Sequence, residues 1–148
     1  MARAVVHALE LAAEDSVRWT AEMCDSEWNR SPMGLPSLAW QMRHIARSTD
    51  RLLTYAEGRQ LSEEQLAALR SEHATGTASE LYAELTKALE DASLRAIDLA
   101  ALDPETTRSV GRKALPTTVG GLLVHVAEHT QRHTGQLVTT AKLLRALR

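Results

Sequence analysis

Three histidines recur every fourth residue near the end of the sequence: His125, His129 and His133. The segment that carries them, residues 117–148, is rich in Leu, Val and Ala and predicts a long helix. Residues four apart lie on the same face of a helix, where two imidazoles can bind one metal ion. The pattern therefore indicates metal coordination.

A helical wheel places two of these rings in the middle of the apolar stripe. With Leu122 at zero and about 100° per residue, His133 falls near 20° and His129 near 340°. His125 falls at roughly 300° and Gln136 at roughly 320°, on the same side. One buried histidine is more often hydrogen-bonded than metal-bound, but two in adjacent turns would each cost roughly 1–3 kcal/mol if unpaired. A divalent ion removes that cost, because it accepts a lone pair from each ring.

A third ligand is expected from another helix, because two histidines rarely suffice for a metal site. The remaining histidines are His7, His44 and His73. His73 is expected to be solvated. On the wheel of the second helix, with Leu38 at zero, His44 falls near 240°, at the flank of the apolar stripe rather than in its centre. The wheels alone do not choose between His44 and His7.

The elements that would position these rings are helices. Strong helix formers fill most of the chain, Phe is absent and runs of β-branched residues are rare, which predicts an all-α domain. Four long helices are expected at about 4–23, 37–58, 78–102 and 117 or 118 to 148, with a short accessory helix at 61–73 between the second and third. Ser37 and Ser62 are the expected N-caps, and residues 103–116 are expected to form a loop. The expected apolar stripes are Val5, Leu9, Ala12, Ala13, Val17 and Met23 in the first helix, Leu81, Leu85, Leu89, Ala92 and Ala96 in the third, and Leu122, Val126 and Leu147 in the last. Such helices bury their stripes most simply as a four-helix bundle, a single domain over residues 1–148.

The net charge, the hydropathy and the cysteine content of the chain exclude several classes of function. The 148 residues carry a net charge of −2 with no basic runs, so there is no electrostatic case for nucleic acid. No window has about 18 consecutive apolar residues, so no membrane span is expected. The N-terminal segment is interrupted by charges and is unlike a signal peptide. Cys24 is the only cysteine, which excludes an internal disulfide and favours a cytoplasmic location.

Two further groups of residues have simple interpretations. Arg43, Arg47 and Arg51 form a row on the second helix, away from its apolar stripe, and are expected to form a solvated face or a subunit contact. The three tryptophans, Trp19, Trp28 and Trp40, are expected to be packing residues, with the lining of a pocket as the alternative.

Two segments together resemble the DinB/YfiT-like family of metalloenzymes. They are "SLAWQMRHIARSTDRLL" and "PTTVGGLLVHVAEHTQRHTGQL", and their most specific parts are W-x-x-x-H-I and H-x-x-x-H-x-G-Q. The resemblance implies a four-helix bundle with a divalent metal at one end, bound by one histidine of the second helix and two of the last. Matched by motif, these ligands are His44, His129 and His133. His125, Gln136 and Trp40 would be neighbours in the cavity or support the ligands.

The resemblance also implies a cofactor and a chemistry. Nickel or zinc is the expected metal, with iron or manganese as further candidates. Relatives use a low-molecular-weight thiol, such as mycothiol or bacillithiol, in S-transferase or isomerase reactions on small molecules. The alternative is a noncatalytic metal-binding or stress-response protein that acts as a homodimer, and a homodimer is expected in either case. A zincin-type protease is excluded, because Thr130 stands where that motif requires a glutamate.

Overall fold

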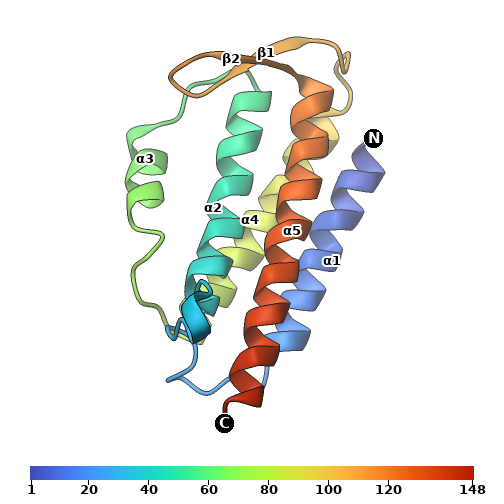
Figure 1. The fold of residues 1–148 in the computed structure, drawn as a ribbon. Helices are drawn as coiled ribbons and strands as arrows, with labels where there is room; N and C mark the ends of the chain where they lie inside the picture. Colours follow the sequence, from blue (N-terminus) through green and yellow to red (C-terminus); the bar gives the residue numbers. More distant parts are fainter.

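The chain is mostly helical, as the sequence predicts (Figure 1). The computed structural model describes all residues, 1–148. Its helices are α1 (Ala2–Thr20), α2 (Leu38–Ala56), α3 (Glu63–Arg70), α4 (Ala78–Leu99) and α5 (Val119–Ala146). A single 3₁₀ turn, Pro32–Gly34, lies in the connection between α1 and α2. No helix has an apolar stretch long enough to span a membrane.

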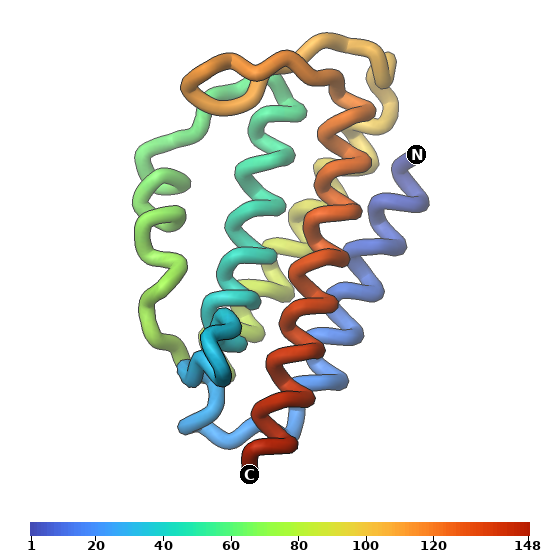
Figure 2. Tube along the Cα trace, viewed as in Figure 1, coloured from blue at the N-terminus to red at the C-terminus, as the bar shows by residue number.

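The four long helices lie side by side around one core (Figure 2). Helix α5 packs against α1 and α2, and α4 packs against the same two helices. The short helix α3 lies outside this group beside α2, and none of its residues is buried (Figure 1). The core therefore forms between α1, α2, α4 and α5, and α3 adds nothing to it.

The buried faces follow the predicted stripes with two exceptions. The stripe of α4 is buried throughout: Leu81, Leu85, Leu89, Ala92 and Ala96. Val17 of α1 was expected inside but is 52% exposed, because the small polar residues Ser16 and Thr20 complete the buried face of that helix. Leu147 was also expected inside but follows the end of α5 and is 47% exposed.

The N-cap residues predicted for α2 and α3 are present and bind the first turn of each helix. Ser37 Oγ accepts a hydrogen bond from Trp40 N at 3.2 Å, and Ser62 forms a capping box with Gln65. Thr118 caps α5 by accepting from Gly121 N at 3.1 Å. Helices α1 and α4 end three residues earlier than predicted, at Thr20 and Leu99, because the chain beyond each tightens into turns with hydrogen bonds between residues three apart.

The expected loop before α5 contains a β-hairpin, which the sequence analysis missed. Strands β1 (Thr107–Val110) and β2 (Leu115–Thr118) pair antiparallel, with Thr107 opposite Thr118. β-Branched residues in both strands favour extended backbone, and the turn between them includes Gly111 at a φ of 71°. The hairpin contacts α2 through β1 and α5 through β2, and it crosses one end of the helices (Figure 1).

The carboxylate of Glu27 ties the α1–α2 connection to the C-terminal residue. It is buried, accepts from Cys24 N at 2.8 Å, and accepts from Nε and Nη2 of Arg148 at 3.0 and 2.9 Å. The hydrogen bond from Arg148 is the main cause that lowers the pKa of Glu27 to about 2, and the bond from Cys24 adds to it. The charged form is therefore the stabilising one.

We expect Glu27→Gln to lower the free energy of unfolding by about 1.5–3 kcal/mol at neutral pH, the net value of hydrogen bonds to a charged group. Because folding lowers this pKa, the stabilisation is complete above the ordinary value near 4.5 and is lost as pH falls towards 2. Urea unfolding of both proteins at pH 6, 4.5 and 3 measures the difference. A difference that grows as the pH falls would contradict the assignment.

Candidate metal centre

Three histidines from two helices form one cluster. His44 lies on α2, and His129 and His133 lie on α5. One ring nitrogen from each residue lies within 4.8 Å of the other two. The ring centroids of His44 and His133 are 4.3 Å apart, those of His129 and His133 are 4.5 Å apart, and those of His44 and His129 are 5.1 Å apart. The packing of α2 against α5 therefore unites the residues that the sequence motifs match.

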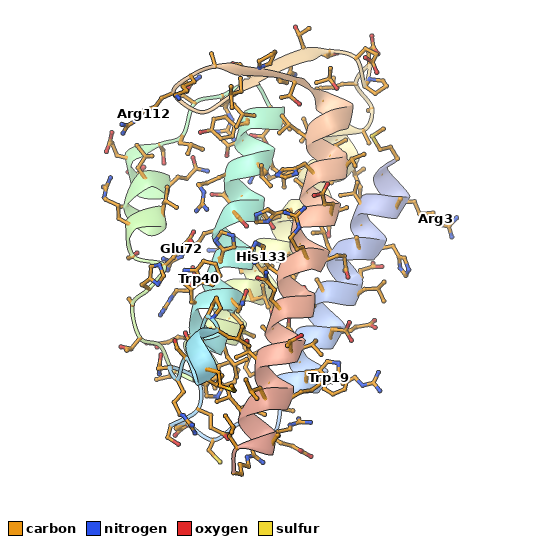
Figure 3. All side chains as sticks on the ribbon, in the orientation of Figure 1. Arg3, Trp19, Trp40, Glu72, Arg112 and His133 are labelled. Carbon is orange, nitrogen blue, oxygen red and sulfur yellow. The ribbon has the colours of Figure 1, made fainter.

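The cluster lies near the middle of α5 rather than at one end of the helices. His133 is about halfway along α5, and Figure 3 shows it at about the same height as Trp40 and Glu72, on the side where α3 lies. The resemblance to the family had implied a site at one end.

The protein holds the Nδ1 atoms of two of these rings with acceptor oxygens. Nδ1 of His44 lies 2.8 Å from Oε2 of Glu72, and Nδ1 of His133 lies 3.4 Å from Oε1 of Gln41. An ionised carboxylate can only accept, so Nδ1 of His44 donates to Glu72, and the amide oxygen of Gln41 is placed to accept from Nδ1 of His133. A ring that donates from Nδ1 in its neutral form has its lone pair on Nε2.

Nδ1 of His129 also lies beside a protein oxygen. It is 3.4 Å from Oγ of Ser48, whose hydroxyl lies 3.4 Å from the backbone oxygen of Ile45 and can donate to it. When it does so, Ser48 accepts from Nδ1 of His129. In all three rings, Nδ1 thus faces a protein oxygen.

The rings on α5 are neutral at pH 7. Burial is the main cause that lowers the pKa of His129 to about 4, and the neighbouring His133 and His44 lower it further. Burial also lowers the pKa of His133, His44 acts in the same direction, and a hydrogen bond from the ring to Gln136 partly opposes both. A metal ion would therefore displace no proton from His129 at neutral pH.

The donor set fits a divalent metal ion. Imidazole nitrogens are ligands that zinc and nickel accept, and three of them meet here. Beside them, Nε2 of the fully buried Gln41 and the buried indole nitrogen Nε1 of Trp40 have no hydrogen-bond partner in the protein. These two donors are free to bind a group held beside the three rings.

The three expected neighbours of the ligands lie at different distances from the cluster. Trp40 stacks on His44, with ring centroids 4.5 Å apart and planes at 9°. Gln136 is exposed but lies close enough to His133 to affect its pKa. The ring of His125 is 5.5 Å from that of His129 and its side chain is 43% exposed, so it lies outside the cluster.

The other two histidines do not join the cluster. His7 lies on the outer face of α1, with its side chain 68% exposed beside Glu10. The choice between His7 and His44 that the wheels left open therefore falls on His44. His73 is exposed, as predicted, but its ring lies 5.7 Å from that of Trp40.

The largest surface cavity, about 770 Å³, lies at the start of α1 and is lined by His7 but by none of the three clustered histidines. A smaller one of about 430 Å³ lies between α1 and α4, and another of about 380 Å³ lies between the same helices nearer the α1–α2 connection. Neither is lined by a histidine. An open cavity beside His44, His129 and His133 stays a prediction.

The sequence analysis missed the groups that orient the rings. Gln41 and Ser48 fall at about 300° and 280° on the wheel of α2, on the same side as His44 near 240°, so a polar flank was visible there. Glu72 gave no such signal, because it lies in the turn that follows α3, where no periodicity applies.

The arginine row of α2 is not a solvated face, contrary to the prediction. Arg43 is buried, and the side chains of Arg47 and Arg51 are only 18% and 12% exposed. They bind Glu84 of α4 and Glu72, together with backbone oxygens near the end of α3. The reason is that α3 and the segment after it cover this face of α2.

Comparison with known proteins identifies the family. A model of the DinB superfamily matches residues 8–137, which is most of the chain. The chain belongs to the DinB superfamily. This confirms the resemblance that the two histidine motifs carry.

A solved structure shares the fold of this chain. It is a crystal structure of a conserved protein from Enterococcus faecalis, 21% identical, with a TM-score of 0.67 over 99% of this chain and 98% of that one. At this identity the likeness concerns the fold alone. A search of curated proteins found no match to the chain.

Proposed function

We propose that this chain is a four-helix-bundle enzyme that binds one divalent metal ion through Nε2 of His44, His129 and His133. The observation that carries the proposal is the convergence of the three rings, with one nitrogen of each within 4.8 Å of the other two and each Nδ1 beside a protein oxygen. Membership in the DinB superfamily supports it. The family resemblance favours nickel or zinc, with iron or manganese as further candidates; imidazole ligands suit nickel, zinc and iron better than manganese.

The three-ligand set favours catalysis over a structural role. Structural zinc sites are usually closed by four protein ligands, and no Cys, Asp or Glu joins these three histidines. A divalent ion held there would lower the pKa of a bound thiol or water and polarise a carbonyl group. The residues around it contact the rings: oxygens of Glu72, Ser48 and Gln41 lie beside the three Nδ1 atoms, and Trp40 restricts the His44 ring by stacking.

For the reaction we propose S-transfer or isomerisation with a low-molecular-weight thiol as cofactor and a small electrophile as substrate. The support is the resemblance to mycothiol- and bacillithiol-dependent relatives. The homodimer expected from the sequence stays a prediction, which light scattering of the purified protein would test.

Metal titration of the chelator-treated protein tests the proposal. We expect one Zn²⁺ or Ni²⁺ per chain by elemental analysis. An ion at 100 times its Kd would add about 2.7 kcal/mol to the free energy of unfolding. For a domain of this size that gain raises Tm by about 5–11 °C. Binding far below one ion per chain, with no change in Tm, would contradict the site.

A thiol-transfer assay with and without chelator then tests the enzyme. Turnover of a thiol and an electrophile that chelator abolishes supports the proposed reaction. Stoichiometric metal without thiol binding or turnover would instead support the noncatalytic metal-binding protein.

A further inference from the structure

A buried carboxylate outside the four long helices contacts the metal centre. Glu72 lies in the turn after α3 and is 4% exposed. Its Oε2 accepts from Nδ1 of His44 at 2.8 Å, and its Oε1 accepts from Nη1 of Arg51 at 2.7 Å. Each carboxylate oxygen therefore has a different partner on α2.

Glu72 is ionised at neutral pH despite its burial. Burial raises the pKa of this carboxyl, but hydrogen bonds from His44 and Arg51 outweigh that effect and lower the pKa overall. A charged acceptor makes a shorter and stronger hydrogen bond than a neutral one. The other two rings have neutral acceptors at 3.4 Å, so His44 has the strongest contact of the three.

We propose that Glu72 is a positioning residue for the metal centre, whose carboxylate fixes the tautomer and the ring orientation of His44. The inference rests on the proposed metal site. Histidine ligands commonly donate their second ring nitrogen to a carboxylate, which fixes the ring and raises its basicity. His44 is the only ligand on α2, so its orientation decides whether its Nε2 meets the pair on α5.

The segment that carries Glu72 is fixed to the rest of the protein on both sides. Before it, Arg47 Nη1 donates to the backbone oxygen of Ala68 at 2.7 Å and to Ser71 Oγ at 3.0 Å. After it, Arg43 donates to the backbone oxygens of Ala74 and Thr75. The arginine row of α2 thus holds the segment, with Arg51 holding the carboxylate itself.

A second anchor lies beyond this segment, at Gly76. Asn29 Nδ2 donates to the backbone oxygen of Gly76 at 3.1 Å, and Gly76 N donates to Asn29 Oδ1 at 3.0 Å. A Cβ at Gly76 would lie 2.6 Å from Nη2 of Arg43. The backbone here packs directly against the guanidinium, which leaves Glu72 little freedom to move away from His44.

The test compares Glu72→Ala and Glu72→Gln with Glu57→Gln. Glu57 is a matched control because its carboxylate also binds an arginine, Arg95 Nε at 2.7 Å, but contacts no histidine. We expect Glu72→Ala to weaken Zn²⁺ binding about 10–100-fold, the usual effect of losing such a partner. Glu72→Gln, which keeps the shape but loses the charge, should lie between Glu72→Ala and the wild type. Glu57→Gln should bind like the wild type.

The second measurement is the ¹⁵N chemical shift of the His44 ring in the metal-free protein. The wild type should show the proton on Nδ1, and Glu72→Ala should show a mixture of both tautomers. A purely structural role for Glu72 would not change this signal selectively. If Glu72→Ala does not fold, Glu72→Gln provides both measurements.

Three results would overturn the inference. They are unchanged affinity in both Glu72 variants, an unchanged His44 tautomer, and an equal loss of affinity in Glu57→Gln. Failure of the proposed function is distinguishable, because the wild type itself would then bind no metal. The tautomer measurement needs no metal and still decides whether Glu72 fixes His44.

Discussion

Replacing His129 by alanine should lower the affinity for Zn²⁺ by roughly 100-fold and remove the gain in Tm that the metal provides. Structural zinc sites with four ligands are worth about 10–16 kcal/mol, so one ligand contributes about 3 kcal/mol. His129 contacts both of the other proposed ligands. The ring of His133 lies one turn after it on α5, and the ring of His44 faces it from α2. Competition with a coloured chelator measures the affinity, and circular dichroism checks that the helices remain.

His125→Ala is the matched control for this experiment. His125 lies on the same helix, one turn before His129, but it is partly exposed and outside the cluster. We expect its removal to leave Zn²⁺ affinity and the Tm gain close to those of the wild type. Equal losses in both variants would mean that the ion binds nearer to the start of α5 than we propose.

Replacing Trp28 by alanine should destabilise the fold by about 3–5 kcal/mol, the usual cost of emptying a buried aromatic site. Trp28 lies in the α1–α2 connection, is 1% exposed, and packs edge-on against Tyr82 of α4 with ring centroids 5.4 Å apart. Its backbone oxygen accepts from Ala39 N at 2.9 Å, which joins the connection to the start of α2. Loss of the indole would leave a cavity where the connection meets the helices.

Met33→Ala tests whether this effect is specific to the buried ring. Met33 lies in the same connection and is 83% exposed, so its loss should change the free energy of unfolding by less than about 0.5 kcal/mol. Urea unfolding of the three proteins measures both values. A small effect of Trp28→Ala would mean that the connection contributes little to stability.

Periodicity and capping predicted most of the fold because they depend on neighbours in sequence. The stripe of α4 and the caps at Ser37 and Ser62 were predicted in this way and are present. The hairpin at β1 and β2 was missed because two strands of four residues give too short a pattern to separate from a loop. Val17 was misplaced because Ser16 and Thr20, which occupy the buried face, are polar.

The candidate site was predictable only in part. The wheel placed His129 and His133 on one inward face, because both belong to one helix. It did not select His44 over His7, since α1 and α2 both pack against α5 and only the fold shows that His7 points outward. Glu72 depends on how the turn after α3 folds back onto α2, a contact between residues 28 positions apart that no local pattern contains.

Helix α3 has no buried residue, yet the chain it leads into holds His44. The orientation of one proposed ligand therefore depends on a segment that lies outside the core. Substitutions in α3 or in the turn after it are expected to alter the contact with His44 without repacking the four long helices.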